Sequence, residues 1–145
     1  SYSTDYNPNE VDSSYNMLLA SNKVNGTVLK PGDVFSYNKV VGERTVAAGY
    51  RNAKVFENGR VVDGLGGGIC QVSTTLYNAA IRAELKITMR AAHSMVVSYV
   101  DPSVDAAIAG TYKDLRFRND YDFPVYIEGY CKKGSNKSCY SGNKY

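Results

Sequence analysis

Apolar positions in the first quarter of the chain recur every three to four residues. This period predicts a helix over residues 9–25, which ends at Asn25-Gly26. The expected buried face of this helix carries Val11, Tyr15, Leu18 and Leu19. A second helical period runs from Gln71 to about Leu85, through Val72, Leu76, Ala79, Ala80 and Ala83.

Between and after these helices, short β-prone runs are separated by turn residues. Asn58-Gly59 between two such runs is a strong hairpin signal, and Pro31-Gly32 marks another turn. The runs are 27–29, 34–37, 53–56, 60–62, 87–90, 94–100, 111–118 and 124–130, whereas 38–49 is typical of a loop. The pattern predicts a single α+β domain over residues 1–145, mostly antiparallel sheet with two main helices.

Composition narrows the class of protein. The 145 residues are 43% hydrophobic, enough for a core, and thirteen Tyr with no Trp favour half-buried sheet. The net charge of +3 is spread along the chain, which argues against a nucleic-acid partner. No apolar run is long enough for a membrane span. Since the chain begins with Ser, we expect a processed or excised domain whose anchor would lie elsewhere in the full-length protein.

The three cysteines divide into a pair and a single residue. Cys131 and Cys139 flank a polar turn-forming segment and are predicted to form a disulfide across a hairpin. A zinc site is the rival interpretation, but the only histidine is His93, and we expect no metal and no cofactor. Cys70 is then a free thiol.

Cys70 follows four glycines within residues 64–68 and opens the second helix. A thiol at a helix start lies at the positive end of the helix dipole, which favours the thiolate. His93 begins a predicted strand 23 residues later and is the candidate base. Asp105 or Asp114, with Asp101 as a further choice, would orient the imidazole. The order Cys, His, Asp along helix, strand and strand resembles a papain- or transglutaminase-like core. A small buried thiol and a strand-edge histidine are the alternative.

Other polar residues around Cys70 are candidate binding groups. Backbone N–H groups of Gly66, Gly67 and Gly68 would hold an anion or an oxyanion, although this turn lacks the Lys of a Walker loop. Further candidates are Gln71, Ser73, Thr74, Ser94 and Arg116. Helix capping by Ser73 and Thr74, and a solvated strand face for Arg116, are the alternatives.

The block Gly-Gly-Gly-Ile-Cys-Gln-Val-Ser-Thr-Thr-Leu-Tyr-Asn-Ala at 66–79 resembles the signature of the VanW family. The similarity extends over about residues 15–127, through 25–26, 31–38, 42, 44–45, 49–50, 93–94, 99–100, 105–106 and 114–117. Two departures are Glu84, where members commonly have Gly, and Ala107, where they often have Thr. Residues 128–145, with the cysteine pair, lie outside the pattern as a C-terminal extension.

The resemblance implies an extracytoplasmic domain of the Gram-positive cell envelope, associated with glycopeptide resistance and partnered with peptidoglycan or its stem peptides. The reaction is left open by the family. A cysteine-dependent hydrolase or acyl-transferase is one hypothesis, and a non-catalytic peptidoglycan-binding or structural module is the other.

Overall fold

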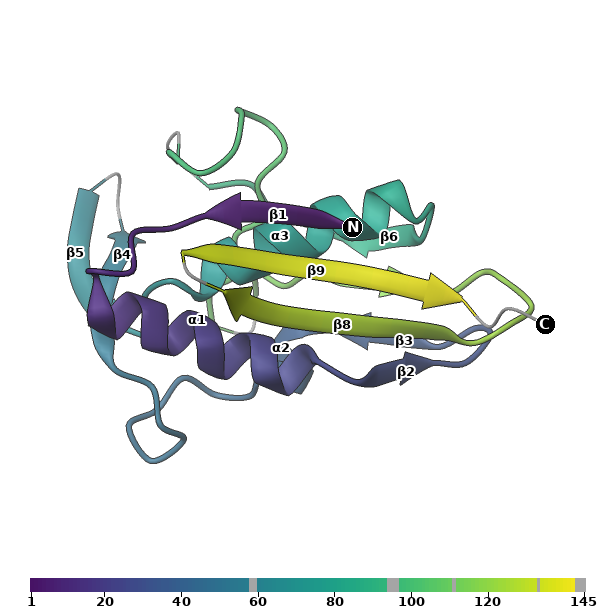
Figure 1. Cartoon of the computed structure of the whole chain (residues 1–145), viewed down its shortest axis with the longest axis horizontal. Helices are drawn as coiled ribbons and strands as arrows, with labels where there is room; N and C mark the ends of the chain where they lie inside the picture. Colours follow the sequence, from purple (N-terminus) through teal and green to yellow (C-terminus); the bar gives the residue numbers. More distant parts are fainter. Residues whose placement is uncertain (58–59, 94–96, 111, 133, 143–145) are drawn as a thin grey trace.

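A computed structural model describes residues 1–57, 60–93, 97–110, 112–132 and 134–142. The chain forms one small α+β domain with antiparallel sheets, as predicted (Figure 1). Its elements are β1 Tyr2–Asp5, α1 Val11–Val24, β2 Thr27–Leu29, β3 Val34–Ser36, α2 Tyr37–Val41, β4 Asn52–Glu57, β5 Arg60–Leu65, α3 Ile69–Arg82, β6 Lys86–Met89, β7 Arg116–Arg118, β8 Val125–Lys132 and β9 Ser135–Gly142.

The largest sheet has the strand order β1-β9-β8-β2. Buried and exposed residues alternate along β8 from Val125 to Tyr130, so one face of this sheet is covered and the other meets solvent. Helices α1 and α3 contact each other and this sheet, α1 at β8 and α3 at β1 and β9. The second sheet, β3-β7-β6, contacts α3 through β6, and β4 with β5 forms a separate hairpin at one end (Figure 1).

Helix α3 is buried almost all round, because it lies between the two larger sheets. Its interior side chains include small or polar residues, such as Ser73 and Ala80, that let neighbouring backbone approach closely. The second predicted helix is therefore a central helix of the fold. Everything that positions the candidate site is attached to it.

The predicted buried face of α1 is wrong. Of its four residues only Leu19 packs against the core, while Val11, Tyr15 and Leu18 are exposed. The helix instead buries Asn16, Met17, Ala20, Ser21 and Val24. Asn16 and Ser21 are buried because hydrogen bonds compensate their lost hydration: Asn16 Nδ2 donates to Arg51 O at 2.8 Å, and Ser21 Oγ accepts from Asn136 Nδ2 at 2.9 Å. The prediction counted only apolar positions, so it did not include these two polar residues in the buried face of α1.

Three further predictions need correction. The loop expected at 38–49 contains α2, whose first turn is capped by Ser36 Oγ accepting from Lys39 N at 3.3 Å. The strand expected at 94–100 is not formed in its described part, 97–100, and of 111–118 only β7 and an isolated bridge at Lys113 pair. β1 and β9 were not predicted as strands; β9 lies between β1 and β8, inside the C-terminal extension.

Glu84 ends α3 in a left-handed conformation, with φ of 58°. The N–H groups of Glu84 and Leu85 donate to Ile81 O and Ala80 O, each at 3.0 Å, which is the Schellman arrangement. A side chain in this conformation is strained, and glycine is not. The departure from Gly noted in the sequence therefore falls where the backbone favours Gly most.

Glu84→Gly is expected to raise the free energy of unfolding by about 1 kcal/mol, since it removes this strain. For a chain of this length that corresponds to a rise in Tm of about 2–4 °C, measurable by calorimetry. Glu84→Ala is the matched control: it keeps a Cβ at the strained position and should give no such rise. An equal gain in both variants would assign the effect to the lost carboxylate.

Candidate active site

The glycine-rich turn, residues 64–68, brings β5 into α3 through close backbone contacts. A Cβ on Gly67 would lie 2.6 Å from both Ala53 C and Lys54 O of β4, and one on Gly68 would lie 2.7 Å from Ser13 Oγ. Gly67 O accepts from Asn16 Nδ2 at 2.9 Å. The space that a side chain would fill at Gly67 and Gly68 is thus occupied by protein atoms, so packing at these two positions requires glycine.

Polar side chains along one edge of α3 hold the segment 104–108 against the helix. Cys70 Sγ donates to Ile108 O at 3.6 Å, Ser73 Oγ to Ala106 O at 2.6 Å, and Asn78 Nδ2 to Val104 O at 2.8 Å. Thr74 Oγ1 accepts from Ala106 N at 2.9 Å.

We call these contacts between α3 and residues 104–108 the polar seam. The spacing of its residues follows from the geometry of a helix packed against an extended segment. Four helical residues rise about 6 Å, and two extended residues span about 6.6 Å, so side chains one turn apart meet alternate carbonyls. Ser73 and Thr74, predicted as binding groups, are engaged in the seam.

The seam places Asp105 next to Ala106, and Asp105 holds His93. His93 Nδ1 lies 2.6 Å from Asp105 Oδ2, and the His93 backbone N–H donates to the same oxygen at 2.6 Å. The two side chains are 5% and 9% exposed. Arg90 Nε donates to Asp105 O at 2.8 Å and fixes the backbone. His93 lies in a loop, not at the start of a strand as predicted, but its imidazole is still oriented by a buried carboxylate.

The electrostatics of Asp105 favour its ionised form. Burial alone would raise the pKa of Asp105, but hydrogen bonds from the His93 backbone and imidazole outweigh burial and hold that pKa below the usual 3.8. An ionised carboxylate that bonds to Nδ1 fixes the tautomer and the orientation of the imidazole.

The thiol of Cys70 is half-buried, and burial raises its pKa above the ordinary value. The hydrogen bond to Ile108 O and the positive charges of Arg44 and Lys113 oppose this rise, while the nearby Asp105 carboxylate adds to it. Cys70 in this arrangement is a thiol at neutral pH rather than a standing thiolate, so any nucleophilic role requires a base.

Asp114 and Arg116 lie where α2 meets β7 and not beside His93. Asp114 is 1% exposed and accepts hydrogen bonds from Ser36 Oγ at 2.6 Å, Asn38 N at 2.8 Å and Arg116 Nε at 2.9 Å. It anchors the start of α2 to β7. Asp105, not Asp114, is therefore the carboxylate beside His93.

Gln71 and Ser94 complete the predicted set. Gln71 Nε2 donates to Thr4 Oγ1 at 3.0 Å and to Asp5 O at 2.7 Å, which ties α3 to β1. Ser94 lies outside the described residues. Asp101, the further candidate, has its backbone oxygen 3.5 Å from Val104 N in the loop before the seam.

The predicted disulfide is wrong. Cys131 is a free thiol, accepting from Asn136 Nδ2 at 3.4 Å and lying 3.6 Å from Ser21 Oγ. The register of the hairpin explains this: Cys131 faces Asn136, while Cys139 faces Glu128, three positions away. That offset separates the two backbones by about 10 Å along the strands, beyond the reach of a disulfide.

Comparison with known proteins identifies the family of this chain. The family model described as "VanW like protein" matches residues 12–139. The chain belongs to the VanW family. This match reaches beyond the 15–127 expected from the motifs and includes β8 and part of β9.

Two relatives in the VanW family are similar over most of this chain. YoaR of Bacillus subtilis (strain 168), an uncharacterized protein, is 41% identical over 126 residues, which cover 87% of this chain and 42% of YoaR. The vancomycin B-type resistance protein VanW of Enterococcus faecalis (strain ATCC 700802 / V583) is 32% identical over 128 residues, covering 84% of this chain and 45% of VanW. The chain thus spans less than half the length of these relatives. No solved structure matches it.

The VanW signature block, 66–79, coincides with the glycine-rich turn and the seam face of α3. Sequence reasoning missed Asn16, Arg90 and Tyr99, which support the block or the His93–Asp105 pair. Asn16 bridges the turn and β4, and burial raises the pKa of Tyr99, to which the Cys70 and Asp105 charges also contribute. The Tyr99-Val100 pair of the family pattern was the one available signal.

Within the part of the chain that the structure describes, no three His, Cys, Asp or Glu side chains gather as a metal site. No helix there has the length and apolar character to cross a bilayer.

Proposed function

We propose that this VanW domain is a cysteine-dependent hydrolase or acyl-transferase. Cys70 is the nucleophile, His93 the general base and acid, and Asp105 the residue that orients His93. The order Cys, His, Asp is that of papain- and transglutaminase-like enzymes, and the proposal adopts their division of roles, with His93 and Asp105 carried on loops.

The observation that carries the proposal is the buried His93–Asp105 pair. An imidazole bonded at 2.6 Å to a carboxylate of lowered pKa is the arrangement that fixes one tautomer and stabilises the imidazolium formed during acyl transfer. The seam brings this pair to the same part of α3 as the Cys70 thiol.

The reaction follows from these roles. His93 removes the thiol proton, and Cys70 Sγ attacks the carbonyl carbon of an amide. The C–N bond breaks, and the amine leaves with the proton from His93. Water, or a second amine, then attacks the thioester and releases Cys70. The N-terminal end of α3 supplies dipole stabilisation to the oxyanion.

The proposed substrates are peptidoglycan stem peptides, and the proposed location is the cell envelope outside the membrane. The support is the relative named as a vancomycin B-type resistance protein, since glycopeptide resistance concerns the cell wall.

A non-catalytic wall-binding module is the second candidate. It is favoured by one observation: Cys70 donates to Ile108 O and has a raised pKa, as expected of a thiol that serves the seam alone.

Site-resolved alkylation by iodoacetamide separates the two candidates. If His93 is the base, Cys70 should react in the native protein, and His93→Ala should slow its modification at least tenfold at pH 7, as expected for loss of a general base. Cys131 is the internal control, because it is a half-buried thiol in another part of the fold, and its rate should not change. A Cys70 that reacts only after unfolding would overturn the catalytic proposal.

A further inference from the structure

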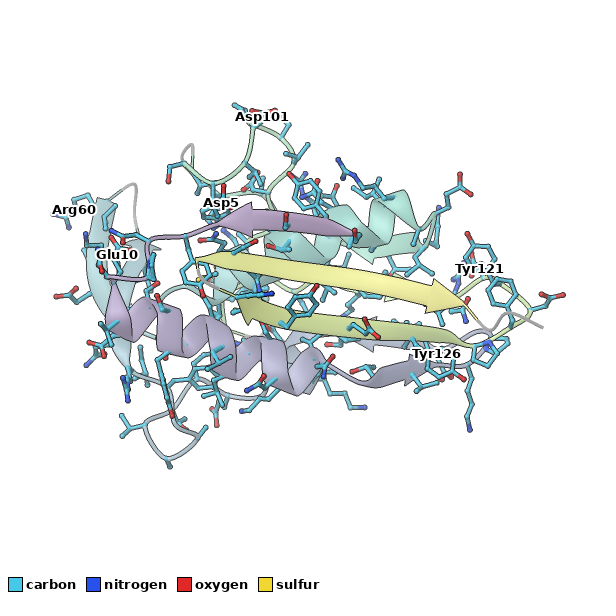
Figure 2. All side chains as sticks on the ribbon, viewed as in Figure 1. Asp5, Glu10, Arg60, Asp101, Tyr121 and Tyr126 are labelled. Atoms are coloured by element: carbon cyan, nitrogen blue, oxygen red, sulfur yellow. The ribbon has the colours of Figure 1, made fainter. Side chains whose placement is uncertain are left out.

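A pocket of about 310 Å³ lies beside the candidate active site, and none of the roles assigned so far uses it. It is formed where the end of β1 and the start of α1 meet α3 and the residues 98–99. Figure 2 shows Asp5 at the end of β1 and Glu10 just before α1, on the same side of the molecule.

Two lining residues connect this pocket to Cys70. Gln71 follows Cys70 in α3, and Tyr99 belongs to the loop between His93 and Asp105. A ligand seated in the pocket would therefore contact the residue that follows Cys70 in the helix.

The lining of the pocket includes one oriented acceptor and two carboxylates, beside several hydroxyl groups. Gln71 is only 8% exposed, and its amide nitrogen is already held by Thr4 and Asp5 O. Its Oε1 accepts no hydrogen bond from the residues that the structure describes, so it is an oriented acceptor left for a ligand. The charged side chains that line the pocket, Asp5 and Glu10, are both negative.

We propose that this pocket binds the ammonium-bearing segment of a peptide substrate, with Gln71 Oε1 as its oriented acceptor and Asp5 and Glu10 as its charges. An ammonium offers three donors and one positive charge, which fits an acidic pocket with an oriented acceptor. The assignment rests on the proposed function, for which it names the substrate class: a peptide with a free side-chain amine.

Asp5 is expected to contribute more than Glu10 to binding of the ammonium group. Lys54 Nζ lies 3.7 Å from Glu10 Oε1 and neutralises part of that charge.

The test is calorimetric binding of two probes to the full chain with Cys70→Ser, which keeps a donor toward Ile108 O. The probes are a stem tetrapeptide with a free lysine amine and the same peptide acetylated at Nζ. We expect the free-amine peptide to bind about fivefold more tightly, the scale of an exposed ion pair, and Asp5→Asn to abolish the preference. Asp101→Asn, an acidic residue of the neighbouring loop outside the pocket, should leave it unchanged.

Equal binding of the two probes, or a preference that survives Asp5→Asn, would overturn the assignment. Iodoacetamide reactivity of Cys70 is measured separately. An amine preference with an inert Cys70 would uphold the pocket and reject the catalysis, whereas a reactive Cys70 without the preference would reject only the pocket.

Discussion

Asp105→Asn is expected to lower the turnover of a stem-peptide substrate by roughly 10³- to 10⁴-fold, the loss found when the orienting carboxylate of a catalytic triad becomes an amide. The reason is the tautomer of His93. Asp105 Oδ2 now faces the His93 ring nitrogen and backbone N–H, each at 2.6 Å, and an amide NH₂ in that place would repel at least one of them. Turnover is measured as amide cleavage by mass spectrometry.

The same variant should also lose about 2–3 kcal/mol of the free energy of unfolding, because it weakens hydrogen bonds to a buried charge. The lowered pKa of Asp105 gives this loss a pH dependence. The stabilisation is fully present above the unfolded pKa of 3.8 and is lost as the pH falls through the lower folded value. Thermal unfolding at several pH values should show the wild type and Asp105→Asn converging only below about pH 3.8.

Asp114→Asn is the matched control for this experiment. Asp114 is an equally buried carboxylate with several donors, but it holds α2 and β7 rather than His93. It should reduce stability and leave the alkylation rate of Cys70 and the turnover of the folded fraction unchanged. If both variants lowered turnover to the same extent, the loss would come from the fold and not from His93.

Elements defined by local sequence signals were predictable. The strands β4 and β5 and the ends of α1 depend on residues near one another in the chain, and they lie close to where the patterns placed them. The Asn58-Gly59 turn expected between the two strands lies outside the described residues. The polar seam could not be predicted in this way. Its donors on α3 and its carbonyls at 104–108 are separated by 26 to 38 residues, and its hydroxyl and amide side chains have the same pattern as an exposed helix face.

The candidate site also has residues that the sequence could identify and residues that it could not. The glycine-rich turn marked Cys70, and the single histidine marked His93, from the sequence alone. The choice among Asp101, Asp105 and Asp114 required the fold, because each lies on or near an expected strand and only the seam decides which one reaches the imidazole. The disulfide prediction was wrong for a related reason. Cysteine spacing does not specify strand register, and the register of β8 with β9 sets the two cysteines three positions apart.

Gly67→Ala should be among the most destabilising single-methyl changes in the protein, lowering the free energy of unfolding by about 3 kcal/mol or more. The added Cβ would lie 2.6 Å from Ala53 C and Lys54 O. Both are backbone atoms of β4, so no rotamer change relieves the contact. The turn cannot retreat either, because Gly67 O is bonded to the buried Asn16 and Gly66 N to Arg51 O.

Gly129→Ala is the control that isolates this contact. Gly129 also lies in a buried position, but its Cβ would meet Ser21 O at 3.4 Å, an ordinary van der Waals separation. Urea unfolding should therefore give a small change for Gly129→Ala and a large one for Gly67→Ala. Because the Gly67 turn leads directly into Cys70, Gly67→Ala at low temperature, where the protein remains folded, should also change the alkylation rate of Cys70. A folded Gly67→Ala protein with wild-type stability would show that β4 yields at this point and that the turn does not hold α3 in place.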